Sequence, residues 1–146
     1  MCIRDSLKYI NKIENVQRRA TKMVPHIQQL PYEDRLKHLN LFSMNYRRRR
    51  GDLIQLYRIT NKIDNIDNNI VIFDKERLTR GHTLKLKKER GTLDCRKFSF
   101  SRRIFNDWNN LPQEIVLSAS VDAFKTQLDS FFKDKCYKST LADPSL

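Results

Sequence analysis

The chain has 146 residues, of which 39% are hydrophobic and 32% charged, so it can form one domain with a core and a strongly ionic surface. Three Gly and four Pro exclude a fibrous or disordered composition, and the longest apolar run, residues 70–73, is far too short to cross a membrane. Lys and Arg exceed Asp and Glu by 12, which favours a polyanionic partner.

Helical patterns dominate the first part of the chain. Apolar residues recur every three or four positions over residues 8–24, which predicts an amphipathic helix that ends before Pro25. These residues are Ile10, Ile13, Val16, Ala20 and Met23 or Val24. A short helix is expected after Pro31, with Leu36 and Leu39 facing inward.

The next predicted helix, capped by Ser43 and running to about residue 62, contains an internal conflict. Its apolar stripe comprises Tyr46, Leu53, Ile54 and Tyr57. Arg50 lies on the same stripe, so either its head reaches solvent or it pairs with a carboxylate. Asp52 is a poor partner because i,i+2 side chains point apart. Gly51 in mid-helix costs about 1 kcal/mol relative to Ala, which indicates close packing or a kink.

Alternating residues predict a small β-hairpin near residues 82–100. In the first strand Leu84 and Leu86 alternate with polar residues, residues 88–91 form a turn, and residues 93–100 return. Phe98 and Phe100 share one face of the return strand, where they either stack on nucleotide bases or, as we expect, belong to the core. Residues 70–73 also read as a short strand.

Two further helices complete the pattern. The first follows the hairpin, carries Ile104, Phe105 and Trp108 and ends before Pro112, and the second begins after Ser120. The predicted fold class is therefore mainly α with a small β-hairpin (α+β), with amphipathic helices around one core. This single domain would span residues 7–135, followed by a frayed tail over 136–146.

The positive charge is concentrated in residues 77–103, where ten Lys or Arg face two acids, whereas residues 104–146 hold four lysines and six acids. Such a concentration favours contacts with nucleic-acid phosphates. The predicted nucleic-acid-binding residues are Arg18, Arg19, Lys22, Arg47, Arg48, Arg80, Lys85, Lys87, Lys88, Arg90, Arg96, Lys97, Arg102 and Arg103.

No catalytic motif is present in the sequence. It lacks phosphate-binding Gly-rich loops, the H-E-x-x-H zinc motif and the nucleophile elbow. Cys2, Cys95 and Cys136 form no C-x-x-C pair, and three scattered histidines give no zinc-ligand spacing. We therefore predict no enzyme, no metal, no cofactor and no small-molecule substrate.

The first six residues, MCIRDS, have neither a capping pattern nor the apolar stretch of a signal peptide. Back-translated as ATG TGT ATA AGA GAC AG, they resemble the mosaic-end adapter of transposase-based sequencing libraries. We expect residues 1–6 to be translated adapter sequence, with the native part starting near Leu7 inside a longer protein.

Three blocks together resemble the region that follows the catalytic part of reverse transcriptases from non-LTR, jockey-like retrotransposons. They are VQRRATKMVPHIQQLPYEDRLKHLNL (16–41), YRRRRGDLIQLYRITN (46–61) and TRGHTLKLKKERGTLDCRKFSFSRRIFNDWNNLP (79–112). The resemblance covers roughly residues 10–133. The family's catalytic aspartate pair is absent, and Arg49 stands where family members usually have an apolar residue.

The resemblance implies a non-catalytic, C-terminal fragment of an RNA-directed DNA polymerase that binds the phosphate backbone of RNA or DNA during target-primed reverse transcription. Its partners would be nucleic acid and the missing upstream polymerase domain, in an intracellular ribonucleoprotein of the nucleus or cytoplasm, without a membrane. Two alternatives remain: a structural or protein-interaction domain that docks on the polymerase core or an acidic partner, and a non-functional pseudogene fragment.

Overall fold

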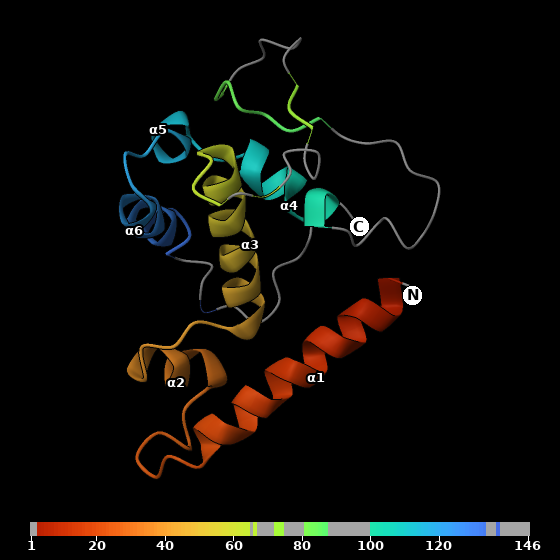
Figure 1. The fold of residues 1–146 in the computed structure, drawn as a ribbon. Coiled ribbons are helices and arrows are strands. Elements are labelled where there is room, and N and C mark those ends of the chain that lie inside the picture. Colours follow the sequence, from red (N-terminus) through yellow and green to blue (C-terminus); the bar gives the residue numbers. More distant parts are fainter. Residues whose placement is uncertain are drawn as a thin grey trace. The chain divides into compact units, whose positions relative to one another are not determined.

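The computed structural model describes residues 3–64, 66, 72–74, 81–87, 100–133 and 137. The helices in these ranges are α1 (Ile3–Lys22), α2 (Tyr32–His38), α3 (Met44–Thr60), α4 (Phe100–Asn109), α5 (Gln113–Val116) and α6 (Val121–Phe131) (Figure 1). The chain divides into unit 1, Met1–Arg49 with Phe132–Leu146, and unit 2, Arg50–Phe131. Helix α3 therefore contributes its first turns to unit 1 and its remainder to unit 2.

Helix α1 of unit 1 overlaps the helix predicted over residues 8–24 but begins at Ile3, and it buries its polar face. The side chains of Glu14 and Thr21 are only 3% exposed, and Gln17 between them is half-buried. The apolar residues Ile13 and Val16 are instead exposed. The predicted period is confirmed, whereas the face that packs inward is selected by hydrogen bonds rather than by apolar burial.

Glu14 fastens α1 to the two other helical elements of unit 1. One carboxylate oxygen accepts a hydrogen bond from the Tyr32 hydroxyl at the start of α2, and the other accepts one from the Asn45 backbone amide at 3.3 Å. Because Asn45 lies in the first turn of α3, the carboxylate supplies an acceptor to an otherwise unpaired helical N–H and favours the positive end of the helix dipole.

Arg35 is a second buried polar anchor, with an exposed fraction of 4%. Its Nε donates to Thr21 Oγ1 at 3.2 Å, and its Nη1 donates to the Leu30 carbonyl at 2.9 Å. The guanidinium thus ties the end of α1 and the connecting segment to α2. Burial of its charge is tolerated because the planar donors are directed at these oxygens.

The start of α3 confirms the predicted cap, because Ser43 Oγ accepts a hydrogen bond from the Tyr46 amide at 3.3 Å. Tyr46 is buried and makes edge contacts with the rings of Phe42 and Phe132, at centroid distances of 5.1 and 6.0 Å. Together with the fully buried Leu36 of α2, these aromatic rings form the apolar part of unit 1.

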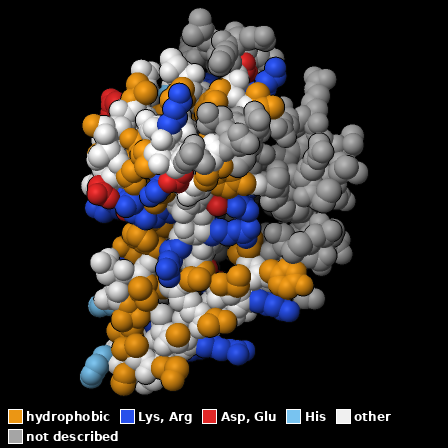
Figure 2. Space-filling view, viewed as in Figure 1, with side chains coloured by type: hydrophobic (Ala, Val, Ile, Leu, Met, Phe, Trp, Pro, Cys, Tyr) orange, Lys and Arg blue, Asp and Glu red, His pale blue; other side chains and the backbone are white. Residues whose placement is uncertain are grey.

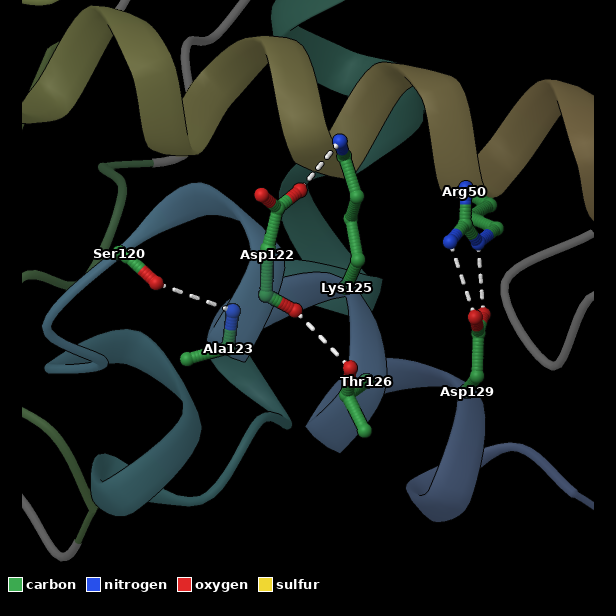
Figure 3. A network of polar contacts seen from close by, with 7 residues as sticks. All are labelled: Arg50, Ser120, Asp122, Ala123, Lys125, Thr126 and Asp129. Carbon is green, nitrogen blue, oxygen red and sulfur yellow. Dashed lines mark hydrogen bonds and ion pairs between the residues drawn. The ribbon is translucent and has the colours of Figure 1, made fainter.

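The core of unit 2 is centred on three aromatic residues from three helices. Tyr57 of α3 stacks on Phe124 of α6 at 4.4 Å, and Trp108 of α4 lies 6.3 Å from Phe124. Trp108 is fully buried, so its indole ring belongs to this core. Helix α6 begins after Ser120, whose Oγ accepts from the Ala123 amide at 3.2 Å (Figure 3).

The predicted β-hairpin over residues 82–100 is wrong. The described residues contain no strand and only a single antiparallel bridge, between Phe73 and Leu86. The Leu86 amide and carbonyl, which a hairpin would pair with a return strand, bond instead to the side-chain amide of Asn109 at 2.8 and 3.1 Å. Phe100, expected in the return strand, is the first residue of α4. Residues 88–99 lie outside the described residues.

The physical reason for this error is that side chains of α4 supply hydrogen-bond partners to the backbone groups of the extended segment. Trp108 Nε1 donates to the Leu84 carbonyl at 2.8 Å, close to the contacts that Asn109 makes with Leu86. An extended segment therefore packs on a helix here, and local alternation cannot distinguish that arrangement from a paired strand.

Arg50 pairs with a carboxylate, which is one of the two outcomes expected from its position on the apolar stripe. Its guanidinium donates to both carboxylate oxygens of Asp129 on α6 (Figure 3). At Gly51, an added Cβ would meet no heavy atom of the described residues within 4 Å. Close packing is therefore not the reason for a glycine at this position.

Candidate nucleic-acid interface

The predicted nucleic-acid-binding residues fall in both units. Arg18, Arg19, Lys22, Arg47 and Arg48 belong to unit 1. Lys85, Lys87 and Arg103 belong to the described part of unit 2. Arg80, Lys88, Arg90, Arg96, Lys97 and the side chain of Arg102 lie outside the described residues.

The five cations of unit 1 lie on two helices that hydrogen bonds hold together. Arg18, Arg19 and Lys22 occupy the last turns of α1, and Arg47 and Arg48 lie near the start of α3. All five side chains are exposed. Gln17 Nε2 donates to the Phe42 carbonyl at 3.0 Å, which fixes the end of α1 beside the segment that leads into α3.

The side chain of Arg18 is held in place by an aromatic ring, unlike that of an ordinary surface arginine. Its guanidinium carbon lies 4.8 Å from the centroid of the Tyr32 ring, a cation–π contact. The Tyr32 hydroxyl donates to Glu14, and burial together with this hydrogen bond raises the tyrosine pKa well above its usual range. Tyr32 therefore stays neutral and presents its ring as a platform for the arginine.

Within unit 1, residues 7–49 carry a net positive charge. Residues 7–49 contain ten Lys or Arg and three acids, a balance of +7. Of the three acids, Glu14 is buried and Asp34 pairs with Lys37 at 3.2 Å. An uncompensated positive field of this kind attracts polyanions and raises their association rate. Sequence reasoning missed this concentration because it focused on residues 77–103, although residue counts per segment could have shown it.

Arginines in the described part of unit 2 act differently, because aspartates hold them in two-point ion pairs. Arg103 donates to both oxygens of Asp52, at 2.6 and 2.8 Å. Arg58 donates to both oxygens of Asp64, and this contact holds the pKa of the Asp64 carboxyl below its ordinary value. Arg103, predicted to contact phosphate, therefore joins α4 to α3 and has its charge balanced in place.

Lys85 and Lys87 flank the bridge residue Leu86. The Lys87 side chain is exposed, while its backbone amide donates to the Ile72 carbonyl at 2.7 Å. Lys85 is half-buried, and its charge contributes to lowering the pKa of His82, although burial of the imidazole is the larger cause. Of these two lysines, Lys87 is the better placed to reach a phosphate.

Neither a metal site nor a membrane span is found within the described ranges. No group of three His, Cys, Asp or Glu side chains is arranged there to hold a metal ion. None of the helices in that part of the chain is both long enough and apolar enough to traverse a bilayer.

Comparison with known proteins gives no match. No protein-family model, curated protein or solved structure matches the chain. The similarity to retrotransposon reverse transcriptases thus rests on the three sequence blocks alone, and the candidate interface rests on the geometry and charge of unit 1.

Proposed function

We propose that the chain is a non-catalytic nucleic-acid-binding domain whose unit 1 holds the phosphate backbone of RNA or DNA. The observation that carries the proposal is the set of exposed cations on α1 and α3, in a unit whose residues 7–49 have a positive charge that exceeds the negative charge by seven. Side chains of this type contact phosphates without reading base sequence.

The resemblance of the sequence blocks extends this proposal to an origin. The chain would be the C-terminal region of a non-LTR, jockey-like retrotransposon reverse transcriptase, acting on template RNA or target DNA in an intracellular ribonucleoprotein. At the genomic locus, a frame that continues upstream of the Leu7 codon into paired polymerase aspartates supports this origin. A locus that itself reads ATGTGTATAAGAGACAG after an in-frame stop contradicts it.

Binding is tested by fluorescence anisotropy with a labelled RNA hairpin and a primer–template duplex at several salt concentrations. Affinity should fall linearly in a plot of log affinity against log salt. The double variant Arg47→Ala/Arg48→Ala should lower the steepness of that slope by about 0.9 for each phosphate that the protein no longer neutralises. Binding that does not depend on salt, or an unchanged slope, contradicts the proposal.

A matched control is available in the chain. The double variant Lys37→Ala/Lys125→Ala removes the same two charges, but these lysines pair with Asp34 and Asp122. If binding depends only on net charge, both double variants weaken it equally. If unit 1 supplies the contacts, the Arg47/Arg48 variant weakens it more.

A second candidate function, docking on another protein, is favoured by a separate observation. Helix α1 presents apolar side chains at the surface, and a nucleic-acid backbone does not cover such a surface.

A further inference from the structure

One face of α1 carries a continuous row of exposed apolar side chains, here called the α1 stripe. It comprises Tyr9, Ile13, Val16 and Ala20 of α1, and it is extended by Met23 in the turn that follows the helix. The exposed fractions of Tyr9, Ile13, Val16 and Met23 are 52%, 51%, 68% and 82%. Figure 2 shows hydrophobic side chains at the surface over α1, with Lys and Arg side chains beside them. Single exposed apolar residues need no explanation, but an aligned row does.

The spacing of the α1 stripe is that of a helix-pairing surface. Its members follow one another at alternating intervals of four and three residues, which is the a and d pattern of a coiled coil. An apolar row with this period matches the apolar row of a second helix, because side chains of each helix then fit between those of the other.

The outward direction of the stripe is fixed by the polar side of the same helix. Glu14 and Thr21 are buried in hydrogen bonds with Tyr32, Asn45 and Arg35. A rotation of α1 that buried the stripe within unit 1 would expose these partners or leave them unpaired, and a buried polar group without a partner is destabilising.

Basic residues determine which helix would fit. At about 100° per residue, Lys12 and Arg19 both project along the edge of the stripe that faces away from Glu14. They are exposed and lie seven residues apart, at equivalent positions of successive heptads. A partner helix would therefore need acidic side chains at the positions that face Lys12 and Arg19.

We propose that the α1 stripe docks an amphipathic helix of another protein, one with an apolar row flanked by Glu or Asp. This function shares Arg19 with the proposed nucleic-acid interface but otherwise uses the stripe and Lys12, so variants of Arg47 and Arg48 separate the two functions. A second copy of the chain is a poorer occupant, because over residues 9–22, where the side chains of α1 are described, its one acid is the buried Glu14. In an antiparallel pair Lys12 would face Arg19 of the other copy.

The test uses synthetic peptides of four heptads. The first has Leu at a and d and Glu at e and g, so that repulsion between its glutamates keeps it monomeric. The second has Lys at e and g, and the third has Glu at e and g but Ser at a and d. Titration calorimetry should show that the chain binds the first at least about ten-fold more tightly than either of the others.

Variants of the chain locate the binding surface. Ile13→Ser/Val16→Ser leaves the net charge unchanged and should weaken binding of the first peptide at least about ten-fold. Asn11→Ser/Asn15→Ser alters two exposed residues of α1 outside the stripe and should have no effect. Lys12→Glu/Arg19→Glu should shift preference toward the lysine peptide, whereas Arg47→Glu/Arg48→Glu should not. Circular dichroism establishes that each variant retains its helices.

Four results overturn the proposal. Equal binding of the serine peptide would show attraction to a polyanion only, and equal binding by the Ile13/Val16 variant would place the contact elsewhere. A dimer in sedimentation equilibrium that this variant abolishes would identify a second copy as the occupant. Stripe-dependent binding to phosphatidylserine vesicles, without peptide binding, would identify a lipid surface.

Discussion

Arg50 and Asp129, which are 79 positions apart in the sequence, are joined by two parallel hydrogen bonds of 2.6 and 2.9 Å. The pair links α3 to α6 and is partly shielded from solvent, because the side chains of Arg50 and Asp129 are only 24% and 31% exposed. Arg50 lies on the apolar stripe of α3, where an unpaired charge would be unfavourable. Its pairing with Asp129 instead gives a directional contact between α3 and α6.

The Arg50–Asp129 pair should contribute measurably to stability. Arg50→Ala and Asp129→Ala are each expected to lower the free energy of unfolding by about 1–2 kcal/mol, because either change leaves a partly buried charge without its partner. In a double-mutant cycle measured by urea unfolding, we expect a coupling of about 1 kcal/mol. The exposed i,i+3 pair Lys125–Asp122 is the control and should show weaker coupling.

Gly51→Ala should stabilise the protein. Gly51 lies inside α3, an added Cβ would meet no atom of the described part of the chain within 4 Å, and alanine reduces the entropy of the unfolded chain. The expected gain is about 0.5–1 kcal/mol in urea unfolding. Gly81→Ala provides the opposite case, because Gly81 has a φ of +115° and its added Cβ would lie 3.1 Å from Lys85 Cε. A loss of stability at Gly51 would show that the helix requires glycine there.

His82 should make stability fall as the solution becomes mildly acidic. Its Nε2 lies 2.9 Å from the Trp108 carbonyl and donates to it, while the buried Nδ1 has no hydrogen-bond partner among the described residues. Burial, with a contribution from the Lys85 charge, lowers the pKa of His82 below its ordinary value of 6.5. Between the two pKa values the unfolded chain binds more protons, so stability is complete above pH 6.5 and decreases as pH falls toward the folded-state pKa.

The His82 effect is separated from other titrations by the variant His82→Gln. Its amide can still donate to the Trp108 carbonyl but does not titrate in this range. Thermal unfolding of both proteins across the mildly acidic range should give a smaller pH slope for the variant. Parallel slopes would exclude His82 as the cause.

Removal of the Glu14 carboxylate should loosen the attachment of α1. Glu14→Ala deprives the Tyr32 hydroxyl and the Asn45 amide of their acceptor, and we expect a loss of about 1–3 kcal/mol of stability. Tyr32→Phe should recover part of that loss in the double variant, because it removes one of the unpaired donors. Additive effects of the two substitutions would contradict the direct contact.

Local signals predict the longer helices because their determinants lie close together in sequence, whereas the four-residue α5 was not predicted. Ser43 precedes the amide that it caps by three residues, and the apolar period of α1 is readable along most of the helix. The partner of Arg50 could not be read from the sequence, because it lies in another helix and several other aspartates were equally available. Only the exclusion of Asp52 followed from helix geometry, and Asp52 pairs with Arg103 instead.

The two main departures share one physical origin. No hairpin forms within the described residues, where the side-chain amide of Asn109 bonds both backbone groups of Leu86, and the inward face of α1 was set by Glu14 and Thr21 rather than by Ile13 and Val16. In both places side-chain hydrogen bonds across the fold outweigh local hydrophobic patterning, which contains no information about them.

Because α1 turns a polar face inward, its detachment from unit 1 should differ thermodynamically from unfolding of an apolar core. Because little apolar area would become hydrated when α1 detaches, its release should carry a small heat-capacity increment compared with disruption of the aromatic core of unit 2. Its detachment should therefore depend weakly on urea as well. Native-state hydrogen exchange should then find the amides of α1 opening by a sub-global step of low m-value, while those around Tyr57 and Leu53 exchange only through global unfolding.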